Sequence, residues 1–229
     1  MNKFILFDID GTLIKKISKT SLHSISFSKA IKKVFGVDCN IHTIAPDGKT
    51  DQQIVIEVLA TKGIDEEEIR GKMKEVMKEM VTIFEENIET EEMTASKGSK
   101  ELIEELSKNN ILTGLLTGNL EPIAMAKMKK VGLDNYFKIG GFGSDDEVRS
   151  NLIKIAIKRA ENVFDFNYND NVFVIGDTPL DIRAGKEAKI KTIGVATGKY
   201  SIEDLKKENP NFVFNDLLQK QEILDVLLN

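Results

Sequence analysis

Two carboxylates one residue apart, Asp8 and Asp10, follow the apolar run Phe4–Phe7 near the start of the chain. Four consecutive apolar residues are long enough for a strand buried on both faces and too short for a helix. In an open α/β sheet, ligands bind just beyond the carboxyl ends of the strands. Alternate side chains of an extended segment point the same way, so both carboxylates could face one ligand. Taken alone, however, the sequence could equally form an ordinary Asx turn before Gly11.

Two further predicted strands also end in polar residues. The strand predicted over 111–116 is followed by Thr117-Gly118-Asn119, and the strand predicted over 172–175 by Gly176-Asp177. Asp181 lies four residues further on. The carboxyl ends of parallel strands lie along one edge of a sheet, so these groups are expected to converge there.

This set of residues suits phosphoryl transfer. Asp8 can attack phosphorus as a nucleophile and form an aspartyl phosphate. Asp10 can protonate the leaving oxygen and then deprotonate the water that hydrolyses the intermediate. Asp177 and Asp8 would hold Mg²⁺, which prefers oxygen ligands and keeps several waters. Without a cation, the clustered carboxylates would repel an incoming phosphate.

The second strand end supplies donors for the phosphate. Thr117 could donate to a phosphate oxygen, and so could the backbone N–H groups of Gly118 and Asn119 at a helix N-terminus. A fixed cation should complete the charge clamp around the transferring group.

The elements between these strand ends define the fold. Helices predicted over 18–35, 51–63 (with Asp51 as its N-cap) and 66–86 form an all-helical insert at 16–88. The third helix carries an apolar stripe of Met73, Met77, Met80 and Phe84, which is expected to lie in the hydrophobic core. Elsewhere helices are predicted over 98–109, 122–131, 148–162, 181–188, 201–208 and 216–228, and strands over 137–140, 191–195 and 212–214.

Alternation of strand and helix predicts an α/β fold, a doubly wound parallel (Rossmann-like) sheet with right-handed crossovers. The core would be discontinuous, formed by residues 1–15 and 89–229, with residues 16–88 as an inserted all-helical cap domain.

Composition limits the partners of the chain. It has 229 residues, of which 41% are hydrophobic and 30% charged, and a net charge of −5. No basic excess is available to neutralise phosphates, so nucleic-acid binding is not expected. The first apolar run ends at Asp8, and no stretch approaches the roughly 20 apolar residues of a membrane helix. A soluble, cytoplasmic protein is expected.

Several other polar residues have plain structural interpretations. The single cysteine, Cys39, cannot form an intrachain disulfide. His23 and His42 lack metal-ligand companions and are interpreted as surface or hydrogen-bonded core residues. The pair Lys15-Lys16 lies in the predicted hinge and is expected to be solvated.

The order and spacing of the polar motifs resemble those of the haloacid dehalogenase-like hydrolases. The matching residues are Asp8-Ile9-Asp10-Gly11-Thr12, then Thr117, a basic residue ahead of the last core strands, and Gly176-Asp177 with Asp181. The resemblance spans the whole chain, and the helical insert is similar to the cap that this family carries after its first motif. It implies that Asp8, the backbone carbonyl of Asp10 and Asp177 bind Mg²⁺, with Asp181 supporting the site.

The third motif departs from the commonest pattern of that family. Many members carry a lysine there, whereas here the segment Gly141–Asp145 is followed by Arg149 before any lysine. We assign the role to Arg149, because a guanidinium can bridge an aspartate and a phosphate oxygen. Lys154 is the reserve candidate, although a solvated helix lysine is its plainer interpretation.

Two features bear on the substrate. The name-giving dehalogenases lack a carboxylate at the position of Asp10, so dehalogenase activity is not expected. The loop Asp47–Gln52 resembles the loop that family caps lower over the site, and Lys49 in it could meet a substrate carboxylate or second phosphate. A solvated lysine beside a helix N-cap is the alternative.

Together these observations predict a Mg²⁺-dependent phosphatase, nearest in resemblance to phosphoglycolate phosphatases. Its substrate would be a small phosphorylated metabolite enclosed by the cap, and the protein a monomer or homodimer. One alternative is a phosphomutase of the β-phosphoglucomutase type, which returns the phosphoryl group to a sugar. The other is a non-catalytic module that binds a phosphate ligand.

Overall fold

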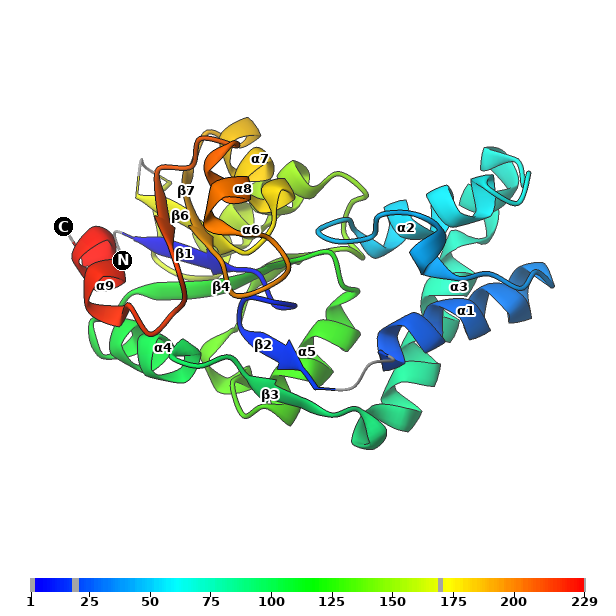
Figure 1. Ribbon diagram of the computed structural model, residues 1–229, viewed down its shortest axis with the longest axis horizontal. Helices are drawn as coiled ribbons and strands as arrows, with labels where there is room; N and C mark the ends of the chain where they lie inside the picture. Colours follow the sequence, from blue (N-terminus) through cyan, green and yellow to red (C-terminus); the bar gives the residue numbers. More distant parts are fainter. Residues whose placement is uncertain (1–2, 18–20, 169–170, 229) are drawn as a thin grey trace.

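A six-stranded parallel sheet forms the centre of the molecule (Figure 1). The computed structural model describes residues 3–17, 21–168 and 171–228. The strand order is β5-β4-β1-β6-β7-β8, so the first strand of the sequence lies in the middle of the sheet. The strands are β1 Phe4–Phe7, β4 Leu112–Thr117, β5 Gly140–Phe142, β6 Val172–Gly176, β7 Lys191–Val195 and β8 Phe212–Phe214.

Helices cover both faces of this sheet because the side chains of its strands alternate between two cores. Ile5 and Phe7 of β1 face one cluster, which α4, α5 and α9 complete. Phe4 and Leu6 face the other, which α6 and α7 complete. The helices of the core are α4 Ser99–Lys108, α5 Glu121–Lys130, α6 Arg149–Val163, α7 Pro179–Glu187, α8 Ile202–Lys206 and α9 Lys220–Leu228, with the 3₁₀ turn η3 Asp134–Tyr136.

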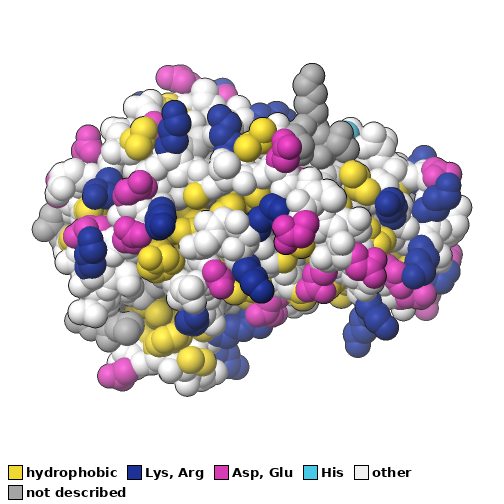
Figure 2. Space-filling model, turned by 90° about the horizontal axis from the view of Figure 1, so that it is seen from below, with side chains coloured by type: hydrophobic (Ala, Val, Ile, Leu, Met, Phe, Trp, Pro, Cys, Tyr) yellow, Lys and Arg dark blue, Asp and Glu magenta, His cyan; other side chains and the backbone are white. Residues whose placement is uncertain are grey.

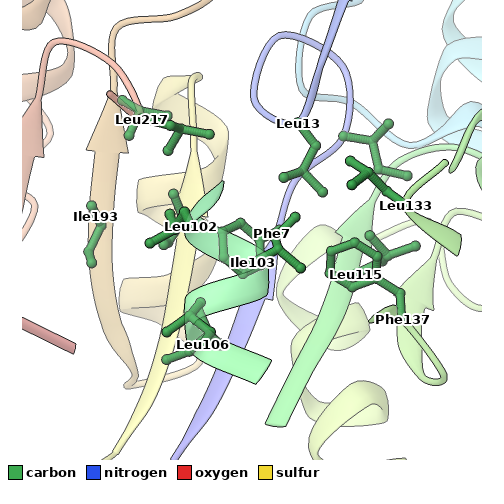
Figure 3. Close-up of a cluster of buried hydrophobic side chains, with 14 of the residues drawn as sticks. Phe7, Leu13, Leu102, Ile103, Leu106, Leu115, Leu133, Phe137, Ile193 and Leu217 are labelled. Atoms are coloured by element: carbon green, nitrogen blue, oxygen red, sulfur yellow. The ribbon is translucent and has the colours of Figure 1, made fainter. Parts of the chain in front are cut away.

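Figure 3 shows the first of these clusters from close by, with α4 lying over the sheet. Leu102, Ile103 and Leu106 of α4 are fully buried there beside Phe7. The Phe7 ring meets Phe137 edge to face, with 6.1 Å between the ring centroids. This core fixes the strand that carries Asp8 and Asp10.

Residues 22–90 form a second body of helices (Figure 1). Its elements are α1 Leu22–Phe35, η1 Ile41–Thr43, α2 Asp51–Ala60, α3 Glu66–Asn87 and η2 Ile88–Thr90. They share their own apolar cluster, to which Leu120 and Ile123 of α5 also contribute. The prediction of an α/β parallel sheet with an all-helical insert is confirmed.

Short strands at both ends of the insert were not predicted. β2 Ile14–Lys16 and β3 Met93–Ala95 pair antiparallel and form a two-stranded ribbon where the chain leaves and re-enters the core. Each has only three residues, too few for a period-two pattern to stand out in the sequence.

Several predicted boundaries need correction. The strand predicted over 137–140 is wrong, because β5 is Gly140–Phe142 and its two glycines hid it. Thr50, and not Asp51, is the N-cap of α2. α7 begins at Pro179, two residues earlier than predicted, and α9 at residue 220, four later. The first helix begins at Leu22, and residues 18–20 of its prediction lie outside the described residues.

The surface carries charges of both signs. Figure 2 shows Lys and Arg side chains interspersed with Asp and Glu on the face it displays. Among the described residues, every helix is too short or too polar to cross a membrane.

Replacing Phe7 with alanine tests whether this core holds the site strand. The ring is fully buried, so its loss should lower the free energy of unfolding by about 3–5 kcal/mol. Phe212→Ala is the matched control, because Phe212 is 39% exposed on the edge strand β8 and should cost less than about 1 kcal/mol. Urea denaturation of both variants measures the difference, and equal losses would contradict the description of Phe7 as a core anchor.

Candidate active site

Three neighbouring strands of the sheet bring their carboxyl ends together. β1 lies between β4 and β6, with Phe7 opposite Leu115 on one side and Ile175 on the other. Asp8, Thr117 and Asp177 therefore lie at one edge of the sheet. A cavity of about 560 Å³ opens over this edge. Its walls include Asp8, Asp10, Thr117, Gly118, Asn119, Arg149 and Asp177 from the core and His23, Phe27, Ile41 and Lys49 from the helical insert.

Three buried carboxylates form a cluster that could hold a cation. Oxygens of Asp8, Asp177 and Asp181 all lie within 4.8 Å of one another. The Asp177 carboxylate can pack closely against two neighbours because both are glycines: a Cβ on Gly11 would lie 2.4 Å from Asp177 Oδ2, and one on Gly198 closer still. An all-oxygen donor set, of which Asp8 and Asp177 line the cavity, fits Mg²⁺.

Asp181 is the most fully engaged member of the cluster. Its Oδ2 accepts hydrogen bonds from the backbone N–H and the hydroxyl of Thr178, at 3.0 and 2.7 Å. The Thr178 hydroxyl in turn accepts from the Asp181 N–H, which completes a capping box at the start of α7. Asp181 Oδ1 accepts from Arg149. Because both of its oxygens already accept hydrogen bonds, Asp181 is the carboxylate of the cluster that neighbouring residues hold most firmly.

Arg149 is the buried cation of the cluster. Its Nη2 donates to Asp8 Oδ1 at 2.7 Å and to Asp181 Oδ1 at 2.5 Å. Its Nη1 donates to the carbonyl of Gly48 in the helical insert. Burial alone would lower the pKa of Arg149, but the two carboxylates hold it above its usual range. Lys154, the reserve candidate, is exposed and donates to Asn151 Oδ1.

The carboxylate cluster contains three acidic side chains but only one cationic partner among the described residues, Arg149. Burial raises the pKa of Asp8 well above its usual range, and the neighbouring Asp181 adds to the rise. Burial, again with Asp181, raises the pKa of Asp177 to about 7. A hydrogen bond from the Thr12 hydroxyl to Asp177 Oδ1 acts against the rise without cancelling it. A divalent cation would remove this unfavourable concentration of negative charge.

Asp10 has a different set of neighbours. Its Oδ2 accepts hydrogen bonds from Lys127 Nζ at 2.7 Å and from Asn119 Nδ2 at 2.8 Å. Lys16 Nζ lies 3.2 Å from its Oδ1. Burial alone would raise the pKa of Asp10, but the Lys127 and Lys16 ammonium groups outweigh it and hold the pKa well below its usual range.

Sequence reasoning missed both lysines. Lys15 and Lys16 are exposed, as expected, but Lys16 also forms an ion pair with Asp10 that was not predicted. Lys127 was overlooked, although the sequence held a signal for it. It lies on the same face of α5 as Ile123, Ala124 and Met128, and a lysine on the apolar face of a helix usually has a buried partner.

Thr117 is poised to donate a hydrogen bond. Its hydroxyl oxygen accepts from the backbone N–H of Asn119 at 3.2 Å and from Asn119 Nδ2 at 2.6 Å. Two accepted bonds use both lone pairs, so the hydroxyl proton is left to donate into the cavity. The N–H of Asn119, predicted to bind phosphate, is instead directed at Thr117, while Gly118 lines the cavity.

The loop before α2 rests on the strand ends. The backbone N–H of Asp51 donates to the carbonyl of Gly118 at 2.8 Å, and Asp51 Oδ2 accepts from the N–H of Leu120. His23 Nε2 lies 3.0 Å from the same oxygen, so this histidine is hydrogen-bonded as expected. Lys49 lines the cavity, but its ammonium group pairs with Glu57.

Comparisons with known proteins agree with this arrangement of motifs. A family model described as haloacid dehalogenase-like hydrolase matches residues 5–195. A Clostridium perfringens protein described as "Putative pyrophosphatase PpaX" is 27% identical over 231 residues, covering 99% of this chain and 98% of the relative.

Two solved structures share the fold. A hydrolase from Pseudomonas syringae superposes with a TM-score of 0.71 at 22% identity, covering 98% of each chain. A structure titled "Putative beta-phosphoglucomutase from Bacteroides vulgatus" gives a TM-score of 0.69 at 21% identity, covering 99% of this chain and 88% of that one.

The charge of the cluster predicts a pH-dependent response to Mg²⁺. Burial raises the pKa of Asp177 to about 7 from its ordinary value of 3.8, so between these limits only the folded state holds this proton. Without metal, the free energy of unfolding should therefore fall as pH rises through that window. Mg²⁺ needs the carboxylate, so its stabilisation should be large at about pH 8 and small at about pH 5.5.

Thermal unfolding with Mg²⁺ or EDTA at the two pH values measures this response. At a Mg²⁺ concentration of roughly 100 times the Kd, stabilisation at the higher pH should reach about 2.7 kcal/mol. Asp177→Asn should abolish it, whereas Asp38→Asn, at an exposed aspartate, should keep it. Equal stabilisation by Mg²⁺ at both pH values, or stabilisation that persists in Asp177→Asn, would contradict the interpretation of Asp177 as a Mg²⁺ ligand.

Proposed function

We propose that this chain, which belongs to the haloacid dehalogenase-like hydrolase family, is a Mg²⁺-dependent phosphatase of small phosphorylated metabolites. One observation carries the proposal: Asp8 and Asp10, two residues apart, have separate sets of partners. Asp8 belongs to the carboxylate cluster with Arg149, while Asp10 is held by lysines outside it. Two carboxylates in unlike environments are suited to two different roles.

In the first half-reaction, Asp8 is the nucleophile. A carboxylate oxygen of Asp8 attacks phosphorus, the bond from phosphorus to the leaving oxygen breaks, and an aspartyl phosphate forms. Asp10 gives its proton to the leaving oxygen. Although the lysines favour the ionised form of Asp10, the negative phosphate arriving beside it favours the protonated form needed for this step.

In the second half-reaction, Asp10 acts as the base. It takes a proton from water as the water oxygen attacks phosphorus, which releases Asp8 and inorganic phosphate. The hydroxyl of Thr117 and the N–H of Gly118 would bind phosphate oxygens in both steps. Arg149 would keep Asp8 oriented and add fixed positive charge.

The carboxylate cluster would hold the metal. Asp8 and Asp177 are the side-chain ligands of the proposal, the backbone carbonyl of Asp10 is added by family resemblance, and Asp181 supports them. When bound, Mg²⁺ offsets the charge of the phosphate and of the carboxylates and polarises the phosphoryl group.

The helical insert would enclose the substrate. We propose residues 16–88 as the cap and residues 1–15 and 89–229 as the core, with Lys49 as a contact to the substrate. An anionic group of the substrate would then take the place of Glu57 as the partner of Lys49. A site enclosed in this way suits a small metabolite such as phosphoglycolate. Pyrophosphate should also be tested, because the Clostridium perfringens relative is described as a pyrophosphatase.

Phosphate release from a panel of phosphorylated compounds tests the proposal. The panel contains phosphoglycolate, pyrophosphate, acetyl phosphate and hexose phosphates, each with Mg²⁺ and with EDTA. Metal-dependent release, strongest for one or two compounds, is expected. Asp8→Asn should lower the rate by about a thousandfold or more, because the covalent intermediate cannot form.

Two other outcomes identify the alternatives. Conversion of a hexose 1-phosphate into its 6-phosphate without release of phosphate would identify a phosphomutase. Binding of a phosphorylated compound that survives Asp8→Asn, with no turnover by the wild type, would identify a binding module. Asp38→Asn is the control for loss of a surface carboxylate and should retain full activity.

A further inference from the structure

Lys127 is a buried cation placed directly behind Asp10. It lies on α5, its side chain is 1% exposed, and it is off the wall of the cavity. Its Nζ donates to Asp10 Oδ2 at 2.7 Å and to Asn119 Oδ1 at 2.6 Å. Burying an ammonium group is unfavourable unless it is paired and hydrogen-bonded, and both partners here belong to the candidate active site.

The two oxygens of Asp10 have unequal surroundings. Oδ2 accepts two hydrogen bonds, from Lys127 and from Asn119. Oδ1, in contrast, is buried and accepts no hydrogen bond from the residues the structure describes, although Lys16 Nζ lies 3.2 Å away. The hydrogen bonds that fix the carboxylate are thus all made to Oδ2, and Lys127 donates one of the two.

Asn119 extends the same network to the phosphate side of the site. Because its Oδ1 accepts from Lys127, its Nδ2 must face the other way, towards Asp10 Oδ2 and the Thr117 hydroxyl. Lys127 therefore fixes the orientation of this amide as well as that of the Asp10 carboxylate. The amide so oriented adds a second hydrogen bond to the Asp10 oxygen that Lys127 holds.

From this geometry we propose that Lys127 is a positioning residue for the acid–base reaction of Asp10, holding Oδ2 so that the carboxylate keeps its place at the wall of the cavity. The proposal rests on the proposed function. Lys127 would act only through Asp10 and Asn119, since it lies behind them and away from the substrate.

A positioning role predicts a loss that depends on the leaving group. Acetyl phosphate and phosphoglycolate are similar in size, but acetate leaves without a proton, whereas the alkoxide from phosphoglycolate needs one. Lys127→Met should lower kcat/KM for phosphoglycolate by about 10- to 100-fold and for acetyl phosphate by less than about threefold. kcat/KM is the right quantity because it reports the steps up to departure of the leaving group.

Several variants separate positioning from damage to the fold. Lys129→Met is the matched control, because Lys129 is exposed on the same helix and its loss should change neither rate. Lys127→Gln keeps a neutral donor of hydrogen bonds and should recover part of the activity on phosphoglycolate. It also serves for the comparison if Lys127→Met does not fold, as judged by thermal unfolding.

A double variant tests whether Lys127 acts through Asp10. Asp10→Asn should show the same dependence on the leaving group, and adding Lys127→Met to it should cost less than about threefold more. Equal losses on both compounds, no loss on either, or an undiminished loss in the Asp10→Asn background would overturn the proposal. A wild-type protein that hydrolyses neither compound would overturn the proposed function, and this inference with it, before any variant is compared.

Discussion

A buried guanidinium holds the carboxylate cluster together, and the rest of the site depends on it. Asp8, Asp177 and Asp181 converge at the sheet edge, where their mutual repulsion and burial both oppose ionisation. Arg149 offsets part of this by donating to Asp8 and Asp181 at once. Its Nη2 donates to both carboxylates while its Nε adds a second bond to Asp181, a planar arrangement of donors that an ammonium group lacks. The remaining negative charge is what makes the cluster suitable for a divalent cation.

The second constraint is the separation of two carboxylates that are neighbours in the sequence. Asp8 is directed to the cluster and Asp10 to Lys127 and Lys16. The turn after β1 makes this possible, since Gly11 adopts a φ of 93° and the next three N–H groups donate to the Ile9 carbonyl. Different neighbours then give the same side chain type opposite proton affinities.

The sequence was sufficient for the sheet and for residues at the strand ends, because continuous apolar runs identify buried parallel strands and the polar residues follow them directly. It was insufficient for β5, where two glycines take the place of apolar residues. It was also insufficient for the ion pairs that Lys16 and Lys127 form with Asp10. Long side chains reach partners far along the chain: Lys127 meets Asp10 across 117 positions. Such a pairing depends on the packing of α5 against the sheet, which no local pattern encodes.

The same lysines connect Asp10 to the helical insert. Lys16 belongs to β2, on the ribbon through which the chain enters the insert, and Lys127 lies 6.0 Å from the centre of the Phe84 ring of α3. Any movement of these helices relative to the sheet would therefore change the surroundings of both cations. Because an ammonium group in an apolar setting needs its partner close by, such a movement would also change the position of Asp10. In the proposed phosphatase, enclosure of the substrate by the helical insert would therefore be coupled to the alignment of Asp10.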